Sequence, residues 1–378
     1  MKNFFIVLAV LTFFPVFAYQ RNQEIYSSYN KVILKNSFLE LTFAPEQLGR
    51  LASAKLLKNN VELTDDFKIL RYQETPLFYL DTNNFQGIRE LFWRQDVSGV
   101  SPMKVVKKTD NTITLTSPSY GGTNLAAKKT ITLNPQELIV NFNTIFTNVG
   151  NKTEKISIWL NLQGSPPALP IIPILGKGKV PSRGEVNLYY RPFIFTGATG
   201  NSYLPPADSW AGFRLVGRKT SWVMECKSLK TNGSQFYSWG NVDNRAPIRT
   251  VEPILPEFSL KPNETSTPIS YRVLVFPGLE NINALCNTTA AQLDIKANQS
   301  LALHLCSAQN IAKTSKVSLN IKDKNNKVSF QKEWIIPARK AGEVITLTTL
   351  LKPIKIEKAT LKIDDTQCEV FFEKDISK

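Results

Sequence analysis

KKTITLNPQELIVNFNTIFTNVGNKTEKISIWLNLQ, residues 128–163, is the stretch that decides the fold of this chain. Its pattern predicts three consecutive antiparallel strands, with turns at Asn134 and Pro135 and at residues 148–152. Successive side chains of a strand point to opposite faces of its sheet, so a strand with one buried side alternates apolar and polar residues. The apolar face of the middle strand consists of Leu138, Val140, Phe142 and Phe146.

The last of the three strands also alternates, and its polar face has an unusual composition. That face carries Ser157, Trp159, Asn161 and Gln163. An aromatic ring can stack on a sugar, and amides both donate and accept hydrogen bonds, so this combination suits a carbohydrate. We therefore expect an antiparallel sheet with one face in a core and one face fit to bind a sugar. The opposite, apolar face consists of Ile156, Ile158, Leu160 and Leu162.

The composition is that of a globular protein with a strong positive charge. The chain has 378 residues, of which 42% are hydrophobic and 20% charged, which is enough for two domains. The formal net charge is +15, and lysines are dense at residues 104–108, at Lys128 and Lys129, and at residues 177–183. We expect a solvated surface there, with an acidic glycan or an anionic envelope surface as the alternative. No helix-turn-helix, zinc-finger or RNA-binding aromatic pattern accompanies the charge, so we expect no nucleic-acid partner.

The first 18 residues, MKNFFIVLAVLTFFPVFA, have the pattern of a secretory signal peptide. A basic start precedes an apolar run at residues 4–14, and small residues at Val16 and Ala18 make a cleavage site. The apolar run is short for a membrane span, and no later segment is long and apolar enough to span a membrane. We therefore expect a periplasmic or secreted mature protein from Tyr19 onwards, without an integral membrane segment. An uncleaved anchor is the alternative.

The chain has four cysteines, and export would allow them to pair. Their wide spacing does not suit zinc, and the only histidine is His304, so we expect no metal and no cofactor. Three pairings are possible, and we favour Cys306 with Cys368 because both belong to predicted strands of the same late segment. The other two cysteines are Cys226 and Cys286.

The remaining pattern predicts an all-β chain with two folded domains. Alternating segments continue to about residue 276, interrupted by a Pro- and Gly-rich stretch at 164–192 that predicts a long loop or a strand-poor excursion. From Leu279 a new unit begins with a short helix or linker at 283–291, and seven short strands follow, which favours an immunoglobulin-like β-sandwich. The predicted organisation is a signal peptide at 1–18, a large antiparallel domain at 19–278 and the sandwich at 279–378.

Three segments of the large domain resemble galactose-mutarotase-like supersandwich proteins. They are VILKNSFLELTFAPEQLGRLASAKLLKNNVEL at 32–63, the stretch at 128–166, and TVEPILPEFSLKPNETSTPISYRV at 250–273. The resemblance covers roughly residues 30–277 and implies a large antiparallel supersandwich. That superfamily includes sugar epimerases, glycoside hydrolase and lyase domains, non-catalytic relatives and the periplasmic domain of the bacterial membrane-protein insertase. The shared fold alone therefore does not determine the function.

The resemblance also implies where a catalytic site would lie. A mutarotase opens a sugar ring with a glutamate base and histidine acids, and both groups must reach the same ring. Glu252 falls where the resemblance places the base. The acid should stand at the end of the strand that contains Asn161, but no histidine is present there and an amide does not donate a proton at a useful pKa. His304 belongs to the C-terminal unit instead.

The other candidate site residues are aromatic, amide and arginine side chains. Tryptophan faces would stack on a sugar, and the amides and arginines would bind hydroxyls or a uronate. The alternative is that the tryptophans belong to the core, that the arginines pair with Glu90 and Asp96, and that Glu252 is a structural carboxylate. The candidates for ligand binding are Trp159, Asn161, Gln163, Arg89, Arg94, Trp222 and Trp239.

These observations leave three hypotheses for the function. The first is an exported carbohydrate-binding or carbohydrate-processing accessory protein, non-catalytic because the mutarotase-type histidine is absent. The second is a glycan-active enzyme (a lyase, hydrolase or epimerase) that uses Glu252 with Tyr189 or Tyr190 in place of the histidine. The third is an envelope protein-interaction or chaperone-like module. No phosphate-binding loop occurs, and a serine or cysteine triad would need a histidine in the same domain.

Overall fold

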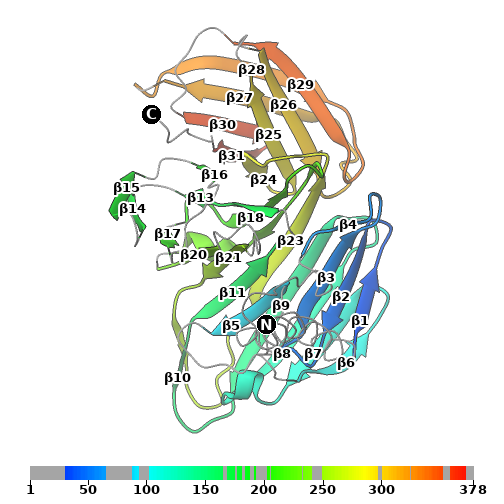
Figure 1. Cartoon of the computed structure of the whole chain (residues 1–378), viewed down its shortest axis with the longest axis vertical. Coiled ribbons are helices and arrows are strands. Elements are labelled where there is room, and N and C mark those ends of the chain that lie inside the picture. The colour runs from blue at the N-terminus through cyan, green and yellow to red at the C-terminus, as the bar shows by residue number, and fades with distance from the viewer. Residues whose placement is uncertain are drawn as a thin grey trace, which may run out of the picture.

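The structure is a computed structural model. It describes residues 30–64, 87–92, 102–164, 168–174, 177–180, 184–187, 191–192, 202–204, 206–231, 233–240, 249–296, 300–323, 325–351 and 358–371. The chain is all-β, as the sequence predicts, and its described part contains strands joined by turns and two short 3-10 segments (Figure 1). In that described part, no helix is long and apolar enough to cross a membrane.

The first large sheet has nine antiparallel strands and contains the sugar-binding candidates. Residues that alternate in the sequence form its central strands, because alternation places one face in the core. Its order is β1 (Val32–Lys35), β2 (Leu39–Ala44), β3 (Arg50–Leu56), β5 (Ile88–Phe92), β11 (Ile158–Gln163), β21 (Arg249–Ile254), β20 (Gln235–Gly240) and β17 (Ser202–Leu204), with β4 (Val61–Glu62) paired to β3.

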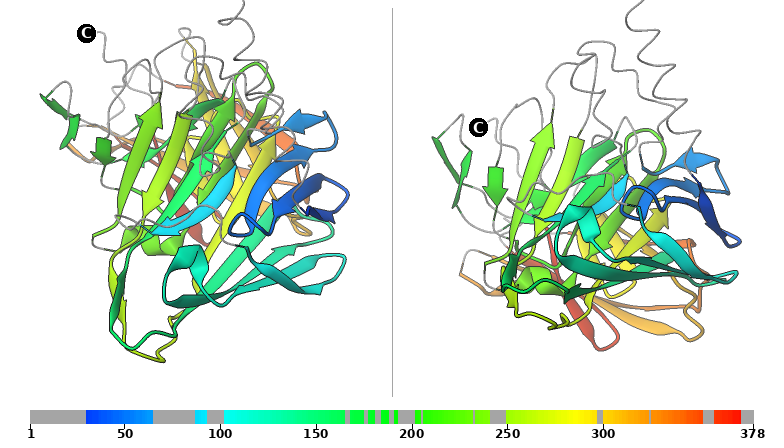
Figure 2. Two further views of the ribbon diagram at one scale, coloured as in Figure 1. Left: turned by 60° about the horizontal axis from the view of Figure 1, so that its bottom comes forward. Right: turned by 90° about the horizontal axis from the view of Figure 1, so that it is seen from below.

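The second large sheet has eight antiparallel strands and packs face to face with the first (Figure 2). Aromatic rings cross the space between the sheets: Phe43 contacts Phe142, and Phe92 contacts Phe146 with ring centroids 5.2 Å apart. The core of the large domain is therefore a layer between two sheets. The order is β12 (Ala168–Ile171), β18 (Trp210–Leu215), β19 (Thr220–Glu225), β23 (Ile269–Pro277), β9 (Ile139–Asn148), β8 (Leu125–Leu133), β7 (Thr112–Ser117) and β6 (Lys104–Lys108).

The stretch at 128–163 forms strands as predicted, but these strands do not stay in one sheet. β8 and β9 pair with each other, whereas β11 lies in the nine-stranded sheet. Between them, β10 (Glu154–Ile156) pairs with β22 (Phe258–Leu260). The buried Asn148 directs this change, because its amide donates to the carbonyls of Lys152 and Leu260 at 2.7 and 2.9 Å.

The C-terminal part is a sandwich of two four-stranded sheets with its own hydrophobic cluster. Residues 283–291, predicted as a helix or linker, instead form a hairpin whose turn holds Asn287 at φ 53°. The immunoglobulin-like topology and the boundary at 278 stay predictions. One sheet consists of β24 (Ala284–Cys286), β25 (Thr289–Ile295), β26 (Ser300–Ser307) and β29 (Val344–Leu350), and the other of β28 (Val328–Ile336), β27 (Ser315–Lys322), β30 (Lys358–Ile363) and β31 (Thr366–Val370).

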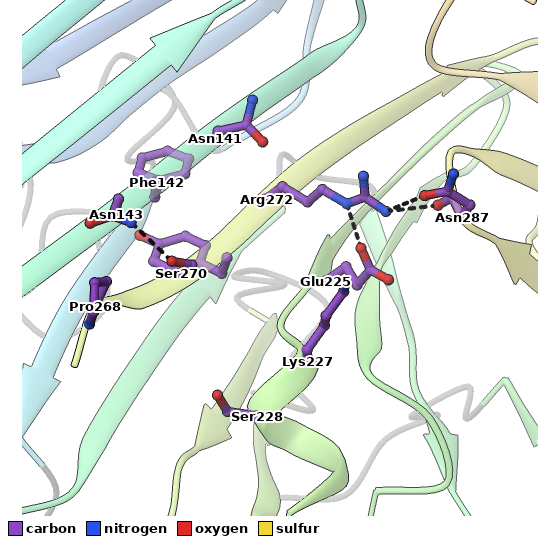
Figure 3. Close-up of a pocket in the computed structure, with 11 residues that line it drawn as sticks. Asn141, Phe142, Asn143, Glu225, Lys227, Ser228, Pro268, Ser270, Arg272 and Asn287 are labelled. Carbon is purple, nitrogen blue, oxygen red and sulfur yellow. Dashed lines mark hydrogen bonds and ion pairs between the residues drawn. The ribbon is translucent and has the colours of Figure 1, made fainter.

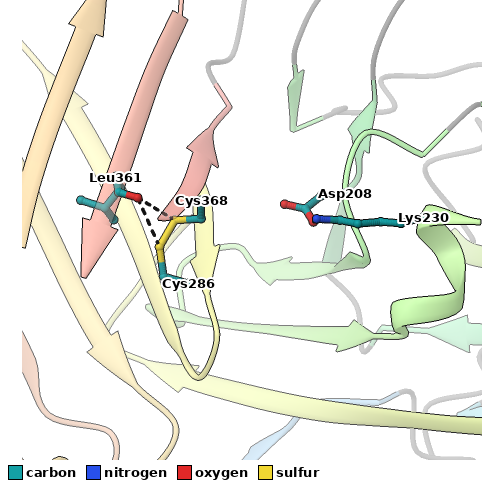
Figure 4. The surroundings of a disulfide bond; sticks show 5 residues. All are labelled: Asp208, Lys230, Cys286, Leu361 and Cys368. Carbon is teal, nitrogen blue, oxygen red and sulfur yellow. Dashed lines mark hydrogen bonds and ion pairs between the residues drawn. A yellow bond between two sulfur atoms is a disulfide. The ribbon is translucent and has the colours of Figure 1, made fainter. Parts of the chain in front are cut away.

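A disulfide joins Cys286 in β24 to Cys368 in β31 and so links the two sheets of this sandwich (Figure 4). The predicted pair of Cys306 with Cys368 is therefore wrong. Cys306 lies in β26, and its thiol is buried against the carbonyl of Pro277 at 3.5 Å. Membership of the same late segment did not reveal which strands become neighbours. Cys226 is also buried and free.

The Pro- and Gly-rich stretch at 164–192, predicted as a long loop or a strand-poor excursion, contains short strands in its described parts. β12 pairs with β18 and so extends the eight-stranded sheet at its edge. Two small two-stranded ladders follow in the chain. The signal peptide predicted at residues 1–18 lies outside the residues that the structure describes. The ladders are β13 (Pro173–Ile174) with β16 (Arg191–Pro192) and β14 (Lys177–Val180) with β15 (Gly184–Asn187).

A buried ion pair connects the two large sheets. Lys129 in β8 lies 3.3 Å from the carboxylate of Glu90 in β5, and both side chains are 1% exposed. The hydroxyls of Thr144 and Tyr271 donate to the same carboxylate oxygen at 3.0 and 2.9 Å. Lys129 also donates to the carbonyl of Leu48 at 3.2 Å. The prediction of a solvated surface is therefore wrong for Lys129.

Candidate functional site

The candidate site is the face of the nine-stranded sheet that points away from the core. β11 turns Ile158, Leu160 and Leu162 into the core, as predicted. The residues that alternate with them, Trp159, Asn161 and Gln163, therefore point to the opposite face. There the backbone register places Asn161 opposite Arg89 of β5 and Gln163 opposite Thr250 of β21.

Glu252 lies on this same face and is bound directly by Trp159. Its position two residues after Thr250 puts both side chains on one side of β21. The indole Nε1 of Trp159 donates to Glu252 Oε2 at 2.8 Å, and the hydroxyl of Thr250 donates to Oε1. Tyr237 of β20 pairs with Glu252 on the other side. The fold thus brings together a tryptophan and a carboxylate that are 93 residues apart in the sequence.

Burial perturbs the ionisation of Glu252. The side chain is 3% exposed, and this desolvation raises the pKa of its carboxyl to about 7. The hydrogen bonds from Thr250 and Trp159 and the positive charge of Arg89 favour the carboxylate and oppose the shift. Burial thus favours the protonated form of this carboxyl.

The two amides of β11 are buried beside this carboxyl. Asn161 and Gln163 are 7% and 5% exposed. The Nε2 group of Gln163 has no hydrogen-bond partner within the described residues. An unpaired buried donor costs on the order of 1–3 kcal/mol, so a ligand that supplies an acceptor would gain from this amide.

The structure does not bring all predicted site residues to this face. Trp222 lies in β19 of the other large sheet, where it is buried, donates to the carbonyl of Leu63 at 2.9 Å and packs 5.1 Å from Phe213. Trp222 is therefore a core residue. Trp239, on β20, pairs in backbone register with Thr250 of β21. Arg94, Tyr189 and Tyr190 lie outside the described residues.

Two contributors to the face were not predicted from the sequence, namely Thr250 and Tyr237. Thr250 shares the alternation of Glu252, so its position two residues earlier was an available signal. Tyr237 becomes a neighbour only through the pairing of β20 with β21, which no local pattern indicates. The hydrogen bonds that hold the Glu252 carboxylate in the described part of the chain come from the side chains of Trp159 and Thr250.

The single histidine lies in the C-terminal sandwich, as the sequence indicated. His304 in β26 contacts Asp294 at 3.1 Å through Nε2 and Thr346 at 2.9 Å through Nδ1. These partners belong to neighbouring strands of the same small sheet. Because the chain has only one histidine, Glu252 has no histidine acid beside it.

We predict that Glu252 makes the stability of the protein fall as the pH rises. Its pKa is raised from 4.5 to about 7 in the folded state, so the folded protein keeps a proton that the unfolded chain has released. This contribution is complete below pH 4.5, is lost as the pH rises through 7, and amounts to about 3 kcal/mol. Urea unfolding between pH 4.5 and 8 measures it. The Glu252→Gln variant should lack this loss, and parallel stability curves for the two proteins would contradict the assignment.

Comparison with known proteins finds solved structures with a similar fold, but no match in sequence. No protein-family model matches the sequence, and no curated protein is similar to it in sequence. A galactose mutarotase-like protein from Lactobacillus casei covers 65% of this chain and 100% of its own, at 13% identity and a TM-score of 0.47. A putative aldose 1-epimerase from Escherichia coli covers 66% and 99%, at 10% identity and a TM-score of 0.48.

A further solved structure aligns slightly better. A TPR-domain containing protein from Parabacteroides distasonis is similar over 65% of this chain and 47% of its own, at 12% identity and a TM-score of 0.50. Galactose mutarotase-like proteins, which the sequence resembles, are thus among the solved structures that are similar to this chain. At these identities the similarity concerns the fold alone.

Proposed function

We propose that this protein is an exported carbohydrate-binding protein that holds a sugar unit on the outer face of the nine-stranded sheet. The observation that carries the proposal is that the oriented Trp159 indole and the buried, unpartnered amide of Gln163 lie on the same face of one strand. Sugars present both an apolar ring face and hydroxyl groups, so a site for them combines both kinds of partner.

The neighbouring groups extend this recognition. Asn161 offers a second amide one position along the same face, and Arg89 lies opposite it in the register. A guanidinium pairs well with a carboxylate, so an acidic sugar suits this end of the face. Mutarotase-like and aldose-epimerase-like proteins are among the structural neighbours, which supports a sugar-directed use of the fold. The pattern of residues 1–18 supports export.

We propose binding without turnover because the described site lacks the histidine acid that works with the glutamate base in a mutarotase. Ring opening needs one group to remove a proton from the anomeric hydroxyl and another to protonate the ring oxygen. Asn161 stands at the position that the resemblance assigns to the acid, and His304 lies in the other domain. An amide supplies a hydrogen bond but no proton.

The proposal predicts that Trp159→Ala weakens binding of the recognised glycan by about tenfold or more, because the variant loses the stacking face; for comparison, stacking of one nucleic-acid base on an aromatic ring contributes roughly 1–3 kcal/mol. The measurement is binding of the purified protein to a glycan array at low and moderate salt. Trp334→Ala, in the C-terminal sandwich, is the matched control and should leave binding unchanged. Binding that survives both Trp159→Ala and Arg89→Ala would remove the site from this face.

A second function, a glycan-active enzyme, is favoured by one observation. The pKa of Glu252 is raised to about 7, which suits a general base at neutral pH. Incubation of the protein with the glycan that it binds distinguishes the two functions. Products that form with the wild type but not with a folded Glu252→Gln variant would establish the enzyme, whereas an intact glycan supports binding alone.

A further inference from the structure

A second polar site lies on the opposite side of the large domain. A groove of about 510 Å³ opens on the outer face of the eight-stranded sheet, where β9, β23 and the end of β19 meet the 3-10 segment Lys227–Lys230 (Figure 3). The turn between β24 and β25 of the C-terminal sandwich closes one end through Asn287. This volume is within the range of pockets that hold small ligands.

The floor of the groove consists of polar side chains that the strand register places side by side. Asn143 of β9 lies opposite Ser270 of β23, and its amide donates to the serine hydroxyl at 3.0 Å. Asn141 lies opposite Arg272 in the next pair of the same face. Because these positions alternate with core residues, all four side chains point outward, away from the core.

The aromatic residues that border the groove do not offer their rings to it. Phe142 and Tyr271 are buried, stack on each other with centroids 4.6 Å apart, and belong to the core. The hydroxyl of Tyr271 donates to Glu90 on that inner side. A ligand in the groove therefore meets amides and hydroxyls from the sheet and no stacking platform.

Arg272 forms a fixed wall between the two domains. Its Nε pairs with the carboxylate of Glu225, and its Nη2 donates to the backbone carbonyl and the side-chain oxygen of Asn287, both at 3.1 Å. The charge of Arg272 is therefore neutralised within the protein. The wall is held in place before any ligand arrives, which lowers the ordering cost of binding.

Two groups of the groove remain available. Within the described residues, the amide of Asn141 and the ammonium of Lys227 make no hydrogen bond or ion pair, and Lys227 is exposed. Since the charges of Arg272 and Glu225 cancel, the groove has one net positive charge, which is that of Lys227. Its chemistry is thus a single cation beside several neutral donors and acceptors.

We propose that this groove binds one acidic sugar residue of a polysaccharide, with Lys227 on its carboxylate and Asn141, Asn143 and Ser270 on its hydroxyls. A uronic acid fits because it combines one negative charge with several hydroxyls and needs no aromatic partner here. The site is separate from the Trp159 face, since the two lie on opposite sides of the sandwich. The proposal holds whether or not the other face binds a sugar.

Calorimetric titration of the full chain with a galacturonic acid trisaccharide tests this inference, with a neutral galactose trisaccharide as the comparison. We expect binding of the acidic trisaccharide, at least about tenfold weaker in Lys227→Gln, which keeps most of the aliphatic stem and removes the charge. Asn141→Asp should weaken binding of the acidic trisaccharide further, because aspartate is similar in size to asparagine but adds a negative charge. Lys332→Gln makes the same charge change on β28 and should have no effect.

Three results would overturn the proposal. One is equal affinity for the acidic and neutral trisaccharides. Another is unchanged binding in folded Lys227→Gln and Asn141→Asp proteins together with its loss in Trp159→Ala, which would assign the sugar to the other face. The third is displacement by inorganic sulfate at equal concentration, which would show a general anion site in which the hydroxyls play no part. Binding that persists in Trp159→Ala supports the groove.

Discussion

Replacement of Lys129 with methionine is expected to lower the free energy of unfolding by about 3–5 kcal/mol, the usual cost of removing one partner from a buried ion pair. Methionine is close to lysine in length and fills most of the space, so packing changes little. What changes is that Glu90 stays in the core without its cation. The hydroxyls of Thr144 and Tyr271 still donate to one carboxylate oxygen.

The other oxygen of Glu90 makes this loss harder to absorb. Glu90 Oε2 is buried and has no hydrogen-bond partner among the described residues even with Lys129 present. A carboxylate in this position cannot turn toward water without opening the contact between the two large sheets. We therefore expect the full cost of an uncompensated charge rather than a local adjustment.

A double-mutant cycle separates the ion pair from packing. Glu90→Gln removes the opposite charge, and the combined Glu90→Gln and Lys129→Met protein removes both. Urea unfolding at pH 7 should show the double variant to be more stable than Lys129→Met alone. If Lys129→Met costs less than about 1 kcal/mol, or if the two changes are simply additive, the pair does not stabilise the fold in this way.

The sequence contained a signal for this pair that charge counting missed. Lys129 occupies the apolar phase of β8, in step with Leu125, Ala127 and Ile131. Glu90 does the same between Ile88 and Phe92. A charged residue at a core position of an alternating strand predicts a buried partner, although alternation does not identify the strand from which the partner comes.

Alternation shows the face of a residue but not its partner strand, and this explains which parts of the site could be predicted. The alternation of β11 correctly assigned Trp159, Asn161 and Gln163 to one face, because a period of two is a local property. Glu252 reached this face through the pairing of β11 with β21, a contact between residues far apart in the chain. The sequence suggested that neighbour only through a resemblance to known proteins.

Trp222 was misassigned because its strand is buried on both sides. Residues on both faces of β19 are buried, so its composition shows no polar side. The C-terminal sandwich covers the outer side: Ser221 donates to the carbonyl of Leu279 at 3.1 Å, and Trp210 on β18 contacts Phe371. Alternation cannot distinguish a core tryptophan from a binding one where a second domain replaces the solvent.

Removal of the disulfide between Cys286 and Cys368 is expected to lower the free energy of unfolding by about 4 kcal/mol. The bond closes a loop with a sequence separation of 82 residues, and a cross-link over such a length removes much of the freedom of the unfolded chain. Both sulfur atoms lie in the hydrophobic cluster of the C-terminal sandwich, between β24 and β31. The two sheets that the bond joins also contact each other through apolar side chains of this cluster and through hydrogen bonds between Asn283 and Phe371.

The measurement is urea unfolding of the Cys286→Ala and Cys368→Ala double variant beside the wild type, with and without a reducing agent. Reduction should weaken the wild type by a similar amount and leave the double variant unchanged. Cys226→Ala is the matched control, because it removes a buried thiol without a cross-link and should cost only about 1 kcal/mol. Equal losses in the control and the double variant would mean that packing, and not the cross-link, carries the effect. A larger loss in the double variant alone would place the stability of the sandwich in the covalent link between its sheets, which an oxidising compartment would maintain.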